Sequence, residues 1–171
     1  MANPIAKITF QTGEVVNIEL YTEEAPLSVA NFVKLATEGY YNGLCLHRII
    51  KGFMIQGGGF IAEKGKLTPA KNLQPIKGEF IANGIMNNVK HVPGVISMAR
   101  TNVMNSATSQ FFLCAGDCAF LDGQYAGFGK TADKESLDAI LKLSQVKTGR
   151  VGYYDDVPVD PVVIKDIIII K

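Results

Sequence analysis

Residues 46–59, with the sequence LHRIIKGFMIQGGG, place a cation, an amide and apolar side chains within one short stretch. Arg48 stands among apolar residues, and a permanently charged guanidinium is costly to hold beside apolar groups unless its donors serve a purpose. Phe53 and Met54 follow it, and the amide of Gln56 lies just beyond them. The pattern predicts an apolar shelf on which a cation touches one polar atom of a bound molecule.

Taken singly, each of these residues has a more common structural explanation. An arginine such as Arg48 is most often a surface or ion-paired residue, and a pair such as Phe53 and Met54 is most often plain core. Gln56 alone would be a turn or edge amide, and His47 a satisfied structural histidine rather than a proton shuttle. On residue types alone, the stretch therefore indicates a β-rich domain with a candidate apolar site that carries a cation.

Length and composition favour one globular domain that spans residues 1–171. The chain is 47% hydrophobic and 19% charged, which is ordinary for a globular protein. Its net charge is +1 and no block of like charge occurs, which argues against binding to nucleic acid or to an anionic membrane. No apolar run reaches the ~20 residues of a membrane span, and the N-terminus lacks the pattern of a signal peptide.

The cysteines and histidines favour neither a disulfide framework nor a metal site. Cys45, Cys114 and Cys118 form an odd-numbered set in apolar surroundings, which suits a reducing compartment. With only His47 and His91 besides, no four ligands stand at the spacing of a zinc site. We therefore expect a cytoplasmic protein without a bound metal.

Periodicity predicts a hairpin at the N-terminus and two helices. Residues 5–10 and 15–20 alternate apolar and polar side chains, as half-buried strands do. A helix should begin at Pro26 and end before Gly39. A second helix should cover residues 134–144, with Asp133 as its N-cap. The residues expected on buried faces are Ile8, Phe10, Val16, Ile18, Leu20, Val29, Phe32, Val33, Ala36, Leu137, Ile140 and Leu141.

The remaining segments predict an antiparallel β-structure. Residues 40–128 are strand-like pieces broken by glycine and asparagine, and residues 61–84 indicate a long surface loop that leads into a short strand. Residues 162–170 are apolar on both faces at their end, so they should pair inside a closed sheet with their outer face covered. A closed barrel with a helix over each end meets these demands.

Three further motifs follow in order after residues 46–59. They are SMAR at 97–100, SATSQFF at 106–112 and FLDG at 120–123. Together the four segments resemble the cyclophilin family of peptidyl-prolyl isomerases, whose patterns are close to FHRxxxxFMxQGGD, SMAN, SQFF and WLDG. The resemblance covers nearly the whole chain, from the first predicted hairpin to the final apolar strand.

The resemblance implies a mainly β fold, with a closed eight-stranded antiparallel barrel and two capping helices. It implies a monomeric isomerase that acts on proline-containing polypeptides during protein folding and needs no cofactor. The family's catalytic residues fall on Arg48, Phe53 and Gln56. Its substrate-binding residues fall on Met54, Ala99, Arg100, Phe112, Phe120, Leu121 and Tyr125.

Prolyl isomerisation demands little machinery, and these residues could supply it. The barrier of ~18–20 kcal/mol arises from the partial double-bond character of the peptide bond, and no bond is broken. Rotation needs an apolar slot for the proline ring, a donor that favours a pyramidal proline nitrogen, and anchors for one side of the peptide. Arg48 would be the donor, and each group would act by stabilising the twisted state more than the planar one.

Departures from the family pattern bear on specificity. Phe120 stands where drug-sensitive members have tryptophan, and Tyr125 where they have histidine, so we expect weak cyclosporin binding. Arg100 replaces an asparagine whose contact we expect to be made by the backbone.

A non-catalytic module that binds proline peptides in the same groove is the alternative function, and a structural β-domain in an assembly is a third. Retention of Arg48 favours the enzyme, since grooves that bind polyproline helices are usually aromatic alone.

Overall fold

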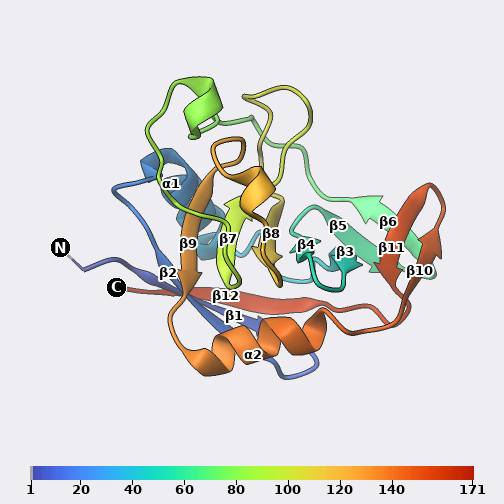
Figure 1. Ribbon diagram of the computed structural model, residues 1–171. Coiled ribbons are helices and arrows are strands. Elements are labelled where there is room, and N and C mark those ends of the chain that lie inside the picture. The colour runs from blue at the N-terminus through green and yellow to red at the C-terminus, as the bar shows by residue number, and fades with distance from the viewer. Residues whose placement is uncertain (1) are drawn as a thin grey trace.

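The alternating residues near the N-terminus form the predicted hairpin in the computed structural model, which describes residues 2–171 (Figure 1). β1 (Ile5–Phe10) and β2 (Val15–Leu20) pair antiparallel. Every second side chain of both strands is buried, because the pleat sends alternate residues to one face. The expected buried face of the hairpin is therefore confirmed.

Six further strands of the described chain join this hairpin in one antiparallel sheet. The order across the sheet is β12-β1-β2-β9-β7-β8-β4-β3. The bounds of the added strands are β3 (Leu46–Ile50), β4 (Met54–Gly57), β7 (Val95–Met98), β8 (Phe111–Cys114), β9 (Gly127–Thr131) and β12 (Ile164–Ile170).

The sheet is curled and open, so the expectation of a closed barrel is wrong. Its two end strands, β12 and β3, form no ladder with each other within residues 2–171. Their ends meet at a bridge between Cys45 and Val163, where the Leu46 amide donates to the Val162 carbonyl and the Ile164 amide donates to the Leu44 carbonyl, both at 2.8 Å. Beyond this point β12 follows β1, and the register shift near Phe10 marks a bulge that bends the strand.

The C-terminal strand is consequently less covered than its sequence predicts. Ile164 and Ile167 are buried, whereas Ile168 and Ile170 are half exposed. β12 is the last strand in the sheet order, so one of its edges has no strand beside it for most of its length. The closed sheet required by its composition is not formed.

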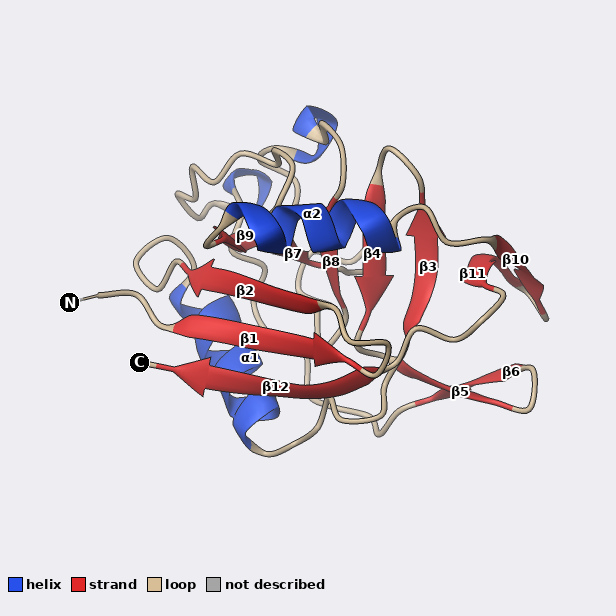
Figure 2. Ribbon diagram, turned by 90° about the horizontal axis from the view of Figure 1, so that it is seen from below, coloured by secondary structure: helices blue, strands red, loops and turns tan. Residues whose placement is uncertain are grey.

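The two α-helices of the described chain lie on opposite sides of the layer formed by β2, β1 and β12 (Figures 1 and 2). α1 runs over Pro26–Thr37 and packs on β12, and α2 runs over Lys134–Leu143 and packs on β2. Asp133 caps α2 as predicted, accepting a hydrogen bond from the Ser136 amide at 2.7 Å. Both predicted helices are confirmed.

The buried faces of the helices differ from the predicted stripes at a few positions. In α1, Ser28 and Leu35 are buried, whereas Val33 is only half buried. In α2, Leu137 and Leu141 are likewise half buried. The residues buried in the two helices are Ser28, Val29, Phe32, Leu35, Ala36, Ser136, Ile140 and Leu143.

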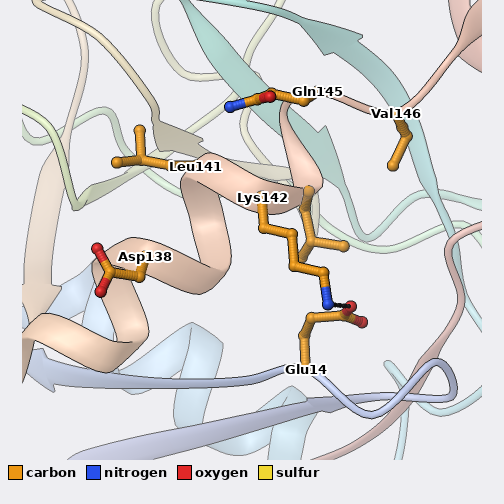
Figure 3. A pocket seen from close by; sticks show the side chains of 7 residues that line it. Glu14, Asp138, Leu141, Lys142, Gln145 and Val146 are labelled. Carbon is orange, nitrogen blue, oxygen red and sulfur yellow. Dashed lines mark ion pairs between the residues drawn. The ribbon is translucent and has the colours of Figure 1, made fainter.

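α2 is also tied to the turn between β1 and β2 on the outside of the molecule. Figure 3 shows Lys142 reaching from the helix toward Glu14, and their Nζ and Oε2 atoms lie 3.3 Å apart. This ion pair crosses the groove beside α2. No helix among the described residues is long and apolar enough to cross a membrane.

Two small hairpins were not predicted. β5 (Phe60–Glu63) pairs with β6 (Lys66–Pro69), so the expected surface loop begins as a hairpin and later holds the short 3-10 helix η1 (Ile81–Asn83). β10 (Thr148–Val151) pairs with β11 (Tyr154–Pro158). Both hairpins lie at the same end of the molecule (Figure 1), where the rings of Phe60 and Tyr154 are 5.2 Å apart.

Candidate functional site

Strand pairing brings Arg48 and Gln56 together on the outer face of the sheet. Arg48 on β3 lies directly opposite Gln56 on β4. Nη1 of Arg48 is 3.5 Å from Oε1 of Gln56, which is a long hydrogen bond. Gln56 Nε2 in turn donates to Oε1 of Gln110 at 3.1 Å. Gln110 was missed by sequence reasoning, although it directly precedes Phe111 and Phe112 in the SQFF motif.

Apolar side chains form a second buried cluster beside this polar row, separate from the main core. Met54 on β4 and Phe112 on β8 are 1% and 4% exposed, and Gln56 pairs with Phe112 across the two strands. Side chains of β4 and β8 are buried on both faces of the sheet. One face contributes to the main core and the other to this second cluster. The half-buried members of the cluster are Ile50, Phe53, Val89, Ala99, Leu121 and Tyr125.

Nine of the ten sequence-predicted site residues line one pocket of about 130 Å³. They are Arg48, Phe53, Met54, Gln56, Ala99, Arg100, Phe112, Leu121 and Tyr125. Phe120 does not line it. Its side chain is 68% exposed and its ring centroid lies 5.5 Å from that of Phe53, so it borders the pocket from outside. The roles of these residues in catalysis and binding stay predictions.

One wall of the pocket comes from the segment that contains the 3-10 helix η2 (Ala119–Leu121). This segment supplies Leu121 and Tyr125, and the Tyr125 ring meets Phe112 edge to face with centroids 5.9 Å apart. Arg100 packs on the other side of Tyr125, with its guanidinium carbon 4.5 Å from the ring centroid. The Arg100 side chain therefore belongs to the wall, in addition to the backbone contact expected from sequence.

A buried polar network supports Phe112 from behind. The His91 ring stacks on Phe112 with centroids 6.0 Å apart. Its Nδ1 lies 3.0 Å from Oδ1 of Asp122 and its Nε2 lies 2.8 Å from Oγ of Ser97. Burial lowers the pKa of His91, although the hydrogen bond to Asp122 acts in the opposite direction. The neutral ring then donates from Nδ1 and accepts the Ser97 hydroxyl at Nε2.

This network escaped sequence reasoning because its members are far apart in the chain. His91, Ser97 and Asp122 carry no common spacing, and only the pairing of β7 with β8 brings Ser97 opposite Phe112. The one usable signal was that Asp122 falls within the FLDG motif. Ser97 and Asp122 hold the His91 ring that stacks on Phe112, and none of the three lines the pocket.

His47 lies outside the pocket, although it precedes Arg48. It is 6% exposed and packs on Phe60, with ring centroids 4.6 Å apart. Burial, with a smaller contribution from the charge of Arg48, lowers the pKa of His47 to about 4. Its Nδ1 has no hydrogen-bond partner within the described chain. His47 therefore lies away from the pocket, but its Nδ1 is unpaired in the described chain, so the expectation of a satisfied histidine is not met.

A larger surface groove of about 500 Å³ lies beside α2 (Figure 3), and no predicted site residue lines it. Its walls are the Lys142–Glu14 ion pair and polar or aliphatic side chains of α2 and the segment after it, without an aromatic ring. The smaller pocket combines aromatic side chains with two guanidinium groups and is the better candidate for recognising an apolar ring. The described residues hold no group of three or more potential metal-ligating His, Cys, Asp or Glu side chains.

Comparison with known proteins places the chain in one family. Residues 5–169 match the family described as cyclophilin type peptidyl-prolyl cis-trans isomerase. Peptidyl-prolyl cis-trans isomerase A of Dickeya dadantii is 46% identical over 168 residues, covering 94% of this chain and 83% of that protein. Peptidyl-prolyl cis-trans isomerase B of Escherichia coli K12 is 40% identical over 170 residues, covering 94% and 97% respectively.

Solved structures share the fold over the full length of the chain. The crystal structure of a cyclophilin-type peptidyl-prolyl cis-trans isomerase from Cryptosporidium parvum has a TM-score of 0.79 at 26% identity and covers 100% of this chain and 99% of its own. A second crystal structure, determined in the presence of the dipeptide Ala-Pro, has a TM-score of 0.76 at 27% identity, with 98% and 99% covered. The chain therefore belongs to the cyclophilin-type peptidyl-prolyl cis-trans isomerases and is an isomerase, as its four ordered motifs predicted.

Proposed function

We propose that this isomerase accelerates rotation about X-Pro bonds of unfolded or loop-exposed chains during protein folding, with the proline ring in the pocket of about 130 Å³. The apolar part of the lining, chiefly Phe53, Met54, Phe112 and Leu121, suits a ring that carries no polar atom outside the backbone. The Cryptosporidium parvum relative, whose crystal structure was determined in the presence of Ala-Pro, supports a proline-containing substrate.

Arg48 is the group that we propose to stabilise the twisted amide. As the peptide bond rotates, the proline nitrogen becomes pyramidal and its lone pair is localised, so a donor near that nitrogen favours the twisted state over the planar one. Arg48 is exposed and lines the same pocket as the apolar residues. Its bond of 3.5 Å to Gln56 is weak, which leaves guanidinium donors for a substrate. This placement is the observation that carries the proposal.

Anchoring of the substrate backbone is assigned to Gln56 and Ala99. The Gln56 side chain is oriented by its bond of 3.1 Å to Gln110, which reduces the rotamer freedom lost on binding. The Ala99 amide already donates to the Gln110 carbonyl at 3.0 Å. The proposed anchor at Ala99 is therefore its carbonyl oxygen.

Replacing Arg48 tests the catalytic proposal. Arg48→Ala should slow cis-to-trans relaxation of an X-Pro peptide ~100-fold or more, which corresponds to about 3 kcal/mol in the barrier. Arg48→Lys should also be poor, because an ammonium lacks the planar fork of the guanidinium. The thermal midpoint should hardly change, since the side chain is exposed.

Arg150→Ala supplies the matched control, because Arg150 is an exposed arginine on β10 and lies outside the pocket lining. It should relax the same peptide at the wild-type rate. A near-normal rate for Arg48→Ala would remove Arg48 from the mechanism. Binding of the peptide without any acceleration by the wild type would favour the non-catalytic binding module.

We also propose that the chain works as a monomer of one domain, in the cytoplasm and without a cofactor. Three free, buried cysteines support a reducing compartment. Sedimentation at micromolar concentration tests whether the chain is a monomer. Turnover after treatment with a chelator tests whether it works without a metal cofactor. A dimer or a loss of activity would contradict them.

A further inference from the structure

The side chain of Arg100 is held rigidly in the wall of the proline pocket. Its guanidinium carbon lies 4.7 Å from the ring centroid of Phe80 and 4.5 Å from that of Tyr125, so the group is sandwiched between two aromatic faces. Nε and Nη2 both donate to the Gln124 carbonyl, at 3.2 and 2.7 Å, and Nη1 donates to the Thr101 carbonyl at 2.9 Å. The positive charge is thereby fixed in space before any ligand arrives.

No carboxylate within residues 2–171 forms an ion pair with this charge. Arg100 bonds only to carbonyl oxygens, and the ion pairs found within residues 2–171 involve neither Arg100 nor Arg48. The lining of the pocket contains both arginines and no acidic residue. Glu79, beside Phe80 in the chain, is buried and accepts hydrogen bonds from α1 instead.

Asp122 is the acidic residue of the adjoining wall, and it is also engaged elsewhere. Its Oδ1 accepts from the His91 amide at 2.6 Å and lies 3.0 Å from Nδ1 of the same residue. It therefore faces His91, behind the pocket. Two guanidinium groups thus line the same partly apolar pocket, which favours a ligand of negative charge.

We propose that Arg100, assisted by Arg48, forms an anion-binding subsite that selects substrates with an acidic side chain next to proline. The inference rests on the proposed role of the pocket and adds a substrate class to it. A guanidinium that is already immobilised loses little side-chain entropy on pairing, and two of its N–H groups are not used by the carbonyls. A carboxylate is the substrate group that can accept from them and neutralise the charge.

The subsite selects by charge, whereas rotation of the peptide bond is assigned to Arg48 and the apolar slot. Pairs of exposed charges contribute at most about 1 kcal/mol, which corresponds to roughly a fivefold preference. We therefore expect kcat/KM for a peptide with Glu beside proline to be about three to five times that of the same peptide with Gln, and a peptide with Lys to be poorer still.

The test compares three peptides that differ only in the residue beside proline, Glu, Gln or Lys, placed before the proline in one set and after it in another. Catalysed exchange is measured by nuclear magnetic resonance and the uncatalysed rate of each peptide is subtracted. The Glu-to-Gln ratio of kcat/KM should exceed one in at least one set. It should shrink between about 0.02 and 0.5 M salt, because salt screens exposed charges.

Variants at Arg100 separate charge recognition from simple support of Tyr125. Arg100→Gln should reduce the Glu-to-Gln ratio at least about twofold, and Arg100→Lys should retain part of it because the charge remains. If Arg100 only supports the wall, both variants should slow all three peptides alike and leave the ratio unchanged. That result, or a wild-type ratio of one in both sets, would overturn the proposal.

The same data distinguish failure of this inference from failure of the proposed function. Turnover of the Gln peptides by the wild type tests whether the pocket isomerises proline bonds at all. Turnover of Gln peptides without a preference for Glu would refute the anionic subsite and leave the isomerase mechanism standing. Absence of turnover for every peptide would refute the mechanism itself, and the subsite with it.

Discussion

At the scale of single residues, Phe120 stands apart from the other predicted site residues. It is 68% exposed and lies outside the pocket lining, with its ring centroid 5.5 Å from that of Phe53. A short proline peptide that occupies the pocket would meet Phe53 and Phe112, whereas a larger ligand that extends over the rim would also cover Phe120. The residue is therefore placed to affect large ligands more than turnover of small ones.

Phe120→Trp should tighten cyclosporin binding while changing peptide turnover only modestly. Tryptophan offers a larger apolar face and an indole N–H donor, and a hydrogen bond to a buried ligand carbonyl contributes ~1–3 kcal/mol, or roughly ten- to hundredfold in affinity. Calorimetric titration of both forms measures the change. Tyr153→Trp, at a 94% exposed position on the β10–β11 hairpin, is the control and should bind like the wild type. Tight binding by the unmodified protein would contradict the idea that Phe120 limits affinity.

At the scale of elements, α1 depends on a carboxylate from a distant segment. Ala25, its N-cap residue, has no side chain able to accept a hydrogen bond. Glu79 replaces the missing cap: Oε2 accepts from the Leu27 amide at 3.1 Å, and Oε1 accepts from the Ser28 amide at 2.6 Å and from its hydroxyl at 2.8 Å. A negative charge at a helix N-terminus is also favoured by the helix dipole.

Glu79→Gln should lower the free energy of unfolding by about 1–3 kcal/mol, because a buried, charge-assisted acceptor of three hydrogen bonds becomes a neutral amide. Urea denaturation measures the loss. Glu135→Gln removes an exposed acidic residue from the first turn of α2 and should cost much less. Equal effects of the two substitutions would show that the buried hydrogen bonds of Glu79 stabilise α1 no more than an exposed acidic residue does.

At the scale of the whole molecule, stability and activity should respond differently to pH. The proposed chemistry transfers no proton, and arginine does not titrate near neutrality, so turnover should vary little between about pH 6 and 8. Stability has a different source of pH dependence, because His47 and His91 are buried and have lowered pKa values. An unfolded chain exposes both imidazoles and binds protons that the folded state excludes.

The free energy of unfolding should therefore fall as the pH decreases from about 6.5 to 4. The folded pKa of His47 is about 4, against an unfolded value of about 6.5, so its contribution is complete above the unfolded pKa and is lost as the pH falls toward the folded one. The loss from this residue is about 3 kcal/mol. Denaturant titrations at a series of pH values should show a shallower slope for His47→Gln. An unchanged slope would show that His47 does not exclude protons.

Local residue patterns were sufficient to predict those elements whose buried face is set by residues a few positions apart in the chain. The hairpin of β1 and β2 and the cap of α2 at Asp133 depend on residues a few positions apart, so their periodicity was visible. The motifs likewise named nine residues that line one pocket. The β5–β6 and β10–β11 hairpins were missed because their strands are short and largely exposed, without a clear alternation.

What the sequence determined was the type of each main element, the membership of the family and the identity of the pocket residues, since these depend on local spacing and ordered motifs. Only the tertiary structure decided how distant segments meet. Strand pairing placed Gln110 beside Gln56 and His91 behind Phe112, and the fold carried Glu79 to the start of α1. It also left the sheet open, because β12 pairs with β1 and forms no ladder with β3 within the described residues. Such contacts depend on how whole strands pack and bend, so the spacing of residues along the chain does not predict them.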